Sequence, residues 1–140
     1  MKASKLAIFL FLLIPFSSFA GTNLDSLWGI WSDDAQADTV RLKAMDDYIW
    51  FGYIFSQPDS ALVLLEELRA FALEKENWKY ESISYSNEAR AHYYLGYLNK
   101  AIENFEKALE LGLKHGDKKL EANMYNSLGV MYKNLGDHAT

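Results

Sequence analysis

Residues 85–96 read YSNEARAHYYLG and residues 125–136 read YNSLGVMYKNLG, so similar segments recur at a spacing of 40 in the sequence. The same spacing extends upstream of both segments, over a stretch long enough for a pair of helices. Matched positions include Ala61 and Ala101, Asn77 and Asp117, Tyr85 and Tyr125, Ala89 and Gly129, Leu95 and Leu135, and Gly96 and Gly136. A fixed period of this length indicates a repeat protein, in which one structural unit recurs along the chain.

The residues around these segments predict helices joined by short turns. Pro58 is the only proline after residue 20, and glycine and asparagine interrupt the apolar periodicity at helical intervals. Pro58 suits the first position of a helix, where its missing N–H is not needed. Polar caps and glycines then set the other boundaries. The expected helices cover residues 23–31, about 38–55, 58–75, 77–95, 98–113 and 117–135.

These patterns resemble a known repeat family. The segment Tyr125-Asn126-Ser127-Leu128-Gly129, followed by Tyr132 and Gly136-Asp137, resembles the first helix of a tetratricopeptide repeat, and Ala101-Ile102 with Phe105, Ala108 and Leu109 resembles the second. The usual period of that family is about 34. The period here is longer and is similar to that of long repeats in bacterial regulatory proteins. The resemblance is closest over residues 81–137 and partial over 38–76. Glu88 and His92 depart from the family pattern.

The resemblance implies an all-α fold, a right-handed α-solenoid of tetratricopeptide-like helical hairpins. A signal peptide is expected to precede it, from the pattern of residues 1–20 described below. Neighbouring hairpins stack because one hairpin cannot bury its apolar stripe alone. Ala89 and Gly129 are expected to let a partner helix approach closely, and Leu24, Trp28 and Trp31 to cover the first hairpin. The expected division is a signal peptide at 1–20, a capping helix and linker at 21–37, a divergent repeat at 38–76, a second repeat at 77–116, and the first helix of a third at 117–140.

The first twenty residues have the pattern of an export signal. Lys2 and Lys5 precede an apolar run, and small residues at Ser18 and Ala20 suit cleavage after Ala20. The alternative is a retained membrane anchor that faces the periplasm. The run is shorter than the roughly 20 apolar residues of a spanning helix, and Pro15 interrupts it. We therefore expect an exported, periplasmic protein.

Composition excludes several kinds of chemistry. The 140 residues contain no cysteine, which rules out disulfides, thiol catalysis and cysteine-ligated metals. The net charge is −5, without a basic patch, so a nucleic-acid partner is not expected. His92, His115 and His138 lack the spacing of a metal site on a helix, and the carboxylates of Asp46 and Asp47 diverge. We predict no catalytic residue, no metal and no small-molecule cofactor.

The resemblance also implies a binding surface, because the first helices of such hairpins line a concave groove. Aromatic side chains beside asparagine and arginine suit recognition of a peptide. The alternative is that these side chains only face solvent. The expected groove residues are Trp50 and Tyr53 in the first repeat, Ser86, Arg90 and Tyr93 in the second, and Asn123, Asn126, Val130 and Lys133 in the third.

The sequence thus predicts a non-catalytic scaffold that binds a protein or peptide partner. The alternative is the N-terminal periplasmic sensory region of a longer signalling protein, a histidine kinase or a nucleotide cyclase, whose catalytic domain follows residue 140. In either case the chain is expected to be a fragment. Because the sixth helix then lacks its hairpin partner, its apolar strip makes self-association through the C-terminal end an additional expectation.

Overall fold

The computed structural model describes residues 23–138, and this part of the chain contains helices and turns without a strand. The predicted signal peptide at residues 1–20 lies outside the described residues. The six helices are α1 (Leu24–Ser32), α2 (Asp38–Gly52), α3 (Pro58–Glu74), α4 (Trp78–Tyr94), α5 (Leu98–His115) and α6 (Lys118–His138). The prediction of an all-helical fold is therefore confirmed for this part.

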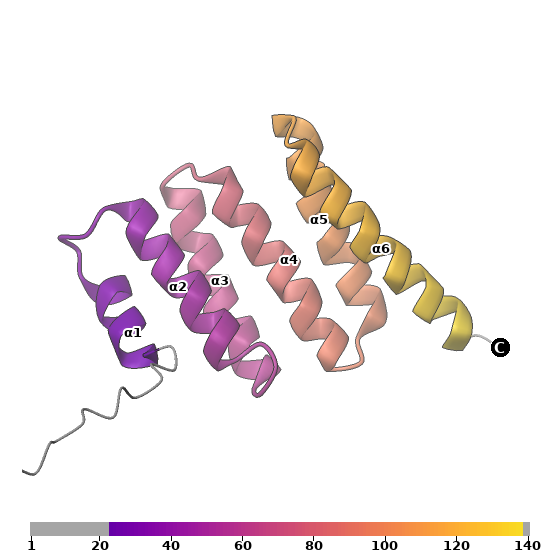
Figure 1. Cartoon of the computed structure of the whole chain (residues 1–140), viewed down its shortest axis with the longest axis horizontal. Helices are drawn as coiled ribbons and strands as arrows, with labels where there is room; N and C mark the ends of the chain where they lie inside the picture. The colour runs from indigo at the N-terminus through magenta and orange to yellow at the C-terminus, as the bar shows by residue number, and fades with distance from the viewer. Residues whose placement is uncertain (1–22, 139–140) are drawn as a thin grey trace, which may run out of the picture.

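The helices stand side by side in chain order, and each packs mainly on its neighbours in the sequence (Figure 1). Helices α2, α4 and α6 form one layer, and α3 and α5 form the layer behind it. Contacts between successive helices are what a stack of helical hairpins requires. The outer surface of the first layer is called the α2/α4/α6 face below.

Three turns share one backbone conformation and recur at even intervals along the chain. Glu76, Gly96 and Gly116 each have a positive φ, of 53°, 81° and 67°. In each turn, the N–H of the following residue donates to the carbonyl five positions earlier, and the N–H of the left-handed residue donates to the carbonyl three positions earlier. This is the Schellman motif, which satisfies carbonyls at the end of a helix. Because the motif recurs at this even spacing, α4 with its following turn and α5 with its following turn have the same length.

The predicted N-terminal caps of α4 and α6 are present. The Asn77 side chain accepts a hydrogen bond from the Tyr80 N–H at 3.2 Å, and that of Asp117 accepts from the Leu120 N–H at 3.0 Å. Pro58 occupies the first turn of α3, as expected. Such caps satisfy backbone donors that have no partner within the helix.

Two helix boundaries differ from the prediction. Helix α2 starts after Ala37 without a side-chain cap and ends at Gly52 rather than near Phe55. A Cβ at residue 52 would lie 3.1 Å from the Leu24 side chain, so α1 packs tightly where α2 ends. Helix α6 continues through Gly136, which does not take the left-handed conformation of Gly96. Glycine permits that conformation but does not impose it.

The buried apolar residues form two clusters. The first lies mainly among α1, α2 and α3, and the second among α4, α5 and α6. Helix α1 covers the first cluster as predicted: Trp31 is buried in it, and Trp28 packs on Tyr48 with ring centroids 5.3 Å apart. Residues of the second cluster are Ala89, Ala101, Ile102, Phe105, Ala108, Met124, Leu128 and Met131.

One packing prediction is wrong. Ala89 is fully buried in the second cluster, but Gly129, its counterpart in α6, is exposed, and a Cβ there would meet no atom within 4 Å. The reason is that α5 covers the side of α4 that carries Ala89. In α6, the side that faces α5 carries Met124, Leu128 and Met131 instead. The close approach predicted at Gly129 is therefore absent.

None of the helices among residues 23–138 has the length and apolar character needed to cross a bilayer.

Candidate functional site

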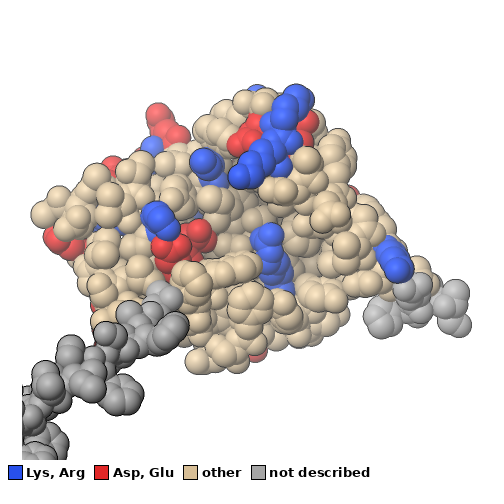
Figure 2. All heavy atoms as spheres, viewed as in Figure 1, with Lys and Arg blue, Asp and Glu red and all other residues tan. Residues whose placement is uncertain are grey.

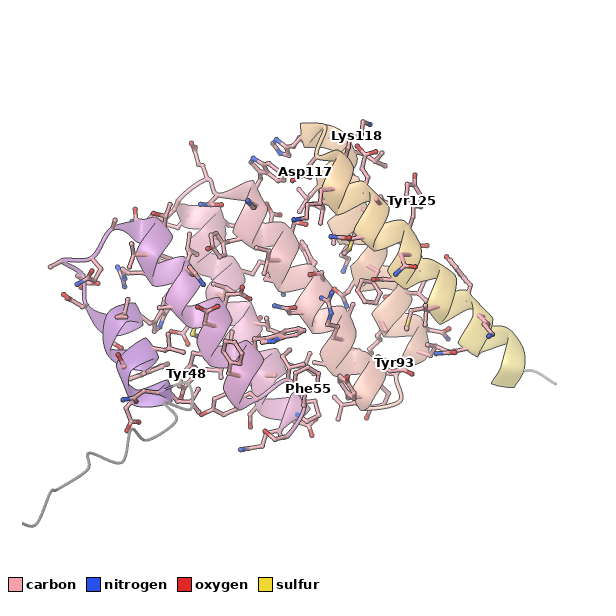
Figure 3. All side chains as sticks on the ribbon, in the orientation of Figure 1. Tyr48, Phe55, Tyr93, Asp117, Lys118 and Tyr125 are labelled. Atoms are coloured by element: carbon pink, nitrogen blue, oxygen red, sulfur yellow. The ribbon has the colours of Figure 1, made fainter. Side chains whose placement is uncertain are left out.

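A cavity of about 250 Å³ opens on the α2/α4/α6 face, and we call it the central pocket. It lies where the C-terminal turn of α2 and the turn that follows it, the C-terminal turn of α4, and the middle of α6 come together, with Phe105 of α5 contributing to its lining. Figure 3 labels Phe55 and Tyr93 at this part of the molecule. Its lining residues are Trp50, Phe55, Arg90, Tyr93, Tyr94, Phe105, Asn126, Ser127, Val130 and Met131.

Four aromatic rings form a continuous wall of the central pocket. Ring centroids are 5.2 Å apart for Trp50 and Phe55, 5.3 Å for Phe55 and Tyr94, and 5.7 Å for Tyr94 and Tyr93. All three pairs meet edge to face, an arrangement that aromatic quadrupoles favour. Phe55 is nevertheless 55% exposed and Tyr94 51% exposed. The wall is therefore ordered by its own contacts while much of its apolar surface remains open to solvent.

Among the described residues that line the pocket, Arg90 supplies the only cationic group. Its guanidinium lies between the rings of Trp50 and Phe105, 5.6 and 5.7 Å from their centroids. Its Nη1 donates to the Ser86 carbonyl at 2.9 Å and to the Asn87 side-chain oxygen at 3.1 Å. Burial lowers the pKa of Arg90, but arginine stays cationic at neutral pH. Within residues 23–138 all its hydrogen bonds start from Nη1, so Nε and Nη2 remain available as donors.

An acidic side chain lies behind Arg90. Asn87 donates from Nδ2 to the Asp46 carboxylate at 2.8 Å, so Asp46, Asn87 and Arg90 form one chain of polar contacts between α2 and α4. Burial, with the nearby charge of Asp47, raises the pKa of Asp46 to about 6, against the opposing effects of Lys43, Arg90 and the Asn87 hydrogen bond. Asp46 therefore changes charge close to neutral pH.

Five of the predicted groove residues meet in the central pocket. These are Trp50, Arg90, Tyr93, Asn126 and Val130. They come from α2, α4 and α6, so these five residues of the projected set lie on one face. Whether they bind a partner stays a prediction.

The other four predicted groove residues lie elsewhere. The Tyr53 hydroxyl is 2.8 Å from that of Tyr48, and its ring packs against the first core cluster, because α2 has already ended at Gly52. Ser86 is buried beneath Arg90 and accepts a hydrogen bond from it. Asn123 lines a separate cavity of about 200 Å³ with Ile83 and Leu120, and Lys133 is exposed on α6 outside the central pocket.

Phe55, Tyr94, Phe105, Ser127 and Met131 line the pocket without having been predicted to do so. Phe55 was expected at the end of a helix, but it reaches Trp50 because it lies in the turn after α2. The aromatic run at residues 93–97 was a usable signal for Tyr94, since a helix cannot bury every member of such a run. Phe105 also belongs to the second core cluster.

The described histidines serve in packing. His92 is buried, its pKa is lowered mainly by that burial, and its Nε2 lies 3.7 Å from the Glu88 carboxylate. The His115 ring stacks on Trp78 at 4.2 Å. Among residues 23–138, no three histidine or acidic side chains gather as a metal site would require.

Comparison with known proteins identifies one repeat. Residues 82–115 match the family described as Tetratricopeptide repeat, and they cover most of α4 and all of α5. The longer variant of that repeat, with its period of 40, remains a prediction. Comparison with curated proteins gives no significant match. The match, together with the all-helical hairpin stack, supports a tetratricopeptide repeat at the α4–α5 hairpin.

Proposed function

We propose that this chain is a non-catalytic scaffold that binds a peptide or protein segment across the α2/α4/α6 face, centred on the central pocket. Tetratricopeptide repeats generally mediate protein–protein interaction. The observation that carries the proposal is the exposed aromatic wall beside Arg90 and Asn126. Large aromatic side chains and arginine are the residue types that most often dominate binding energy in protein interfaces.

The polar groups of the pocket suit recognition better than catalysis. Its ionisable lining residues are an arginine and two tyrosines, and the lining has no carboxylate or histidine to act as a general base. The Ser127 hydroxyl donates to the Asn123 carbonyl of its own helix at 3.0 Å. On the view of this face in Figure 2, charged atoms are sparse at the lower edge, where Figure 3 labels Phe55 and Tyr93. An apolar surface with a few polar groups is typical of an interface.

Peptides selected from a random library on the full chain provide the test. Tyr93→Ala and Asn126→Ala are expected to weaken the selected peptides at least tenfold, because both side chains line the pocket without belonging to a core cluster. Glu103→Ala, exposed on α5 in the other layer, is the matched control and is expected to bind normally. Normal binding by both pocket variants, with loss in the α5 variant, would place the interface on the opposite layer.

The same proposal includes export to the periplasm, with cleavage after Ala20. Its support is the basic and apolar pattern of residues 1–20. Cell fractionation followed by N-terminal sequencing is expected to find the mature chain in the periplasm, beginning at Gly21. A chain that starts at Met1 and sediments with membranes would favour the anchored alternative.

Self-association is a further part of the proposal. Tyr125, Tyr132 and Leu135 expose large side chains along α6. Such a strip favours contact with another apolar surface. Sedimentation of the full chain at increasing concentration is expected to show reversible association that Tyr125→Lys weakens. Association that is unchanged in this variant would place the contact elsewhere.

A further inference from the structure

We infer that the central pocket takes one large apolar side chain of the bound segment, with a neighbouring main-chain carbonyl of that segment accepting a hydrogen bond from Arg90. This inference rests on the proposed function and specifies which peptide chemistry the site selects. It commits to an apolar anchor, rather than an acidic side chain or a separate small molecule, as the occupant.

The volume of the pocket limits the size of the occupant. At about 250 Å³, the central pocket is smaller than typical small-molecule and cofactor sites, which occupy about 300–1,000 Å³. A cavity of about 150 Å³ already accommodates a benzene ring. The pocket therefore has room for one phenylalanine-sized side chain, together with part of the chain that carries it.

The walls of the pocket favour an apolar occupant. Trp50, Phe55, Tyr93 and Tyr94 present ring faces and edges, and Val130 and Met131 complete the lining on the α6 side. A ring inserted between them gains edge-to-face contacts of the kind that already joins Phe55 to Tyr94. Val130 is 47% exposed, so insertion also removes apolar surface of this chain from water.

The charges around the pocket argue against a charged anchor. Arg90 repels a lysine or arginine side chain. An acidic anchor would meet a guanidinium that Asn87 already connects to the Asp46 carboxylate, and it would lose its hydration against aromatic rings. A main-chain carbonyl avoids this cost, since it can accept from the free donors of Arg90 while the apolar side chain fills the pocket.

Asn126 complements this arrangement from α6, whereas Arg90 lies on α4. Its side-chain amide lines the pocket and makes no hydrogen bond to any other group in the described residues. An amide can donate to one main-chain carbonyl and accept from one main-chain N–H. Arg90 and Asn126 therefore provide polar contacts to a main chain from two helices.

Titrations with three defined peptides test the inference on the full chain. The probes are acetyl-Gly-Gly-Xaa-Gly-Gly-amide with Phe, Ala or Glu at Xaa, and binding is followed by nuclear magnetic resonance. The Phe peptide is expected to bind at least tenfold more tightly than the other two, with shifts at the Trp50 indole N–H and the Asn126 amide. Equal affinity for all three, or tightest binding of the Glu peptide, would overturn it.

A filling variant provides the matched structural control. Val130→Trp is expected to occupy the pocket and weaken the Phe peptide at least tenfold, whereas Val63→Trp, 68% exposed on α3, leaves affinity unchanged. Circular dichroism reports whether both variants keep their helicity. If one variant unfolds, the three-peptide titration of the unmodified chain tests the inference alone. Library peptides that bind Tyr93→Ala more weakly but bind Val130→Trp normally would contradict the apolar anchor. The proposed peptide-binding function would remain supported in that case. Library peptides whose affinity is unchanged by both Tyr93→Ala and Asn126→Ala would instead overturn the proposed binding face, and with it the proposed function.

Discussion

Helices α4 and α6 have similar sequences one repeat period apart, but their surroundings differ. Helix α4 packs on α3 and α5 and touches α2, whereas α6 packs on α5. Ala89 is fully buried, while its counterpart Gly129 is exposed. His92 is buried, while Tyr132 at the same position of α6 is 50% exposed. One pattern therefore produces a core helix in one place and a half-covered helix in the other.

The comparison shows that burial in a repeat protein depends on neighbours as well as on the pattern. The apolar side of α6 that faces α5 carries Met124, Leu128 and Met131, and these residues are buried. The side that matches the α5-facing side of α4 remains open. Substitutions in different surroundings should therefore have unequal effects. The four predictions below compare such pairs, in decreasing order of expected size.

The largest difference is expected between a side chain in the α4–α5–α6 core and one on the open side of α6. Phe105→Ala should reduce the free energy of unfolding by about 3–5 kcal/mol, because it removes a buried ring and leaves a cavity. Tyr125→Ala should change it by less than about 0.5 kcal/mol, since the side chain is 57% exposed. Urea unfolding measures both. Similar losses in the two variants would mean that Tyr125 is covered in solution.

The second prediction concerns the polar contact that α4 makes with α2. Because the pKa of Asp46 rises from 3.8 to about 6 in the folded state, its contribution to stability is complete below pH 3.8 and is lost as the pH rises through 6. Asp46→Asn keeps the neutral form at every pH. It should match the wild type near pH 4 and exceed it by up to about 3 kcal/mol at pH 7 and above.

Unfolding of both proteins in urea at a series of pH values checks this. Glu103→Gln, an exposed control on α5, should show no such gain. The pH dependence contributed by His92 is common to wild type and variant, so it cancels in the difference. A constant difference between pH 4 and 8 would show that Asp46 does not titrate in this window.

The third prediction compares the small residues at matched positions. Ala89→Leu should destabilise the fold by about 1–3 kcal/mol, because the added atoms enter a filled core. Gly129→Ala should instead stabilise it by about 0.5–1 kcal/mol, since nothing obstructs a Cβ there and glycine weakens a helix interior. Thermal or urea unfolding distinguishes the signs. Destabilisation by Gly129→Ala would indicate a neighbour against that surface.

The smallest effect is expected in the turns that precede the two helices. Glu76 takes the left-handed conformation before α4, where Gly116 takes it before α6. Glu76→Gly should gain up to about 1 kcal/mol by removing the steric cost of a Cβ, partly offset by greater freedom of the unfolded chain. Gly116→Ala should lose a similar amount. The two substitutions are expected to change the free energy of unfolding in opposite directions, which urea unfolding measures. A lower free energy of unfolding in both variants would refute the shared turn geometry.

Much of the fold was predictable because local signals are strong. Caps at Asn77 and Asp117, the proline at 58 and the glycines at 96 and 116 act through bonds within a few residues, so the sequence reports them directly. The end of α2 at Gly52 was missed, and Leu24, from a separate helix, packs against that position. The exposure of Gly129 was missed because burial at that position depends on a neighbouring helix.

The candidate site was predictable only in part, for related reasons. Helical projection placed Trp50, Arg90, Tyr93, Asn126 and Val130 on one face, and the structure brings them together. It failed for Tyr53, because a projection assumes that the helix continues. The raised pKa of Asp46 depends on burial between two helices, and no spacing in the sequence reports it.

The left-handed turn residues at 76, 96 and 116 are evenly spaced, so the layer in which a helix lies depends on its position within this spacing. Each interval contains one helix with its turn, and two intervals return the chain to the same layer. A tandem duplication of a full period, such as 77–116, would therefore extend the stack without altering which side chains point inward. A duplication of half that length would exchange the layers. A short insertion inside a helix would rotate the side chains that follow it in that helix by about 100° per residue. Duplications in this chain are thus expected to be tolerated when their length is a multiple of the full period.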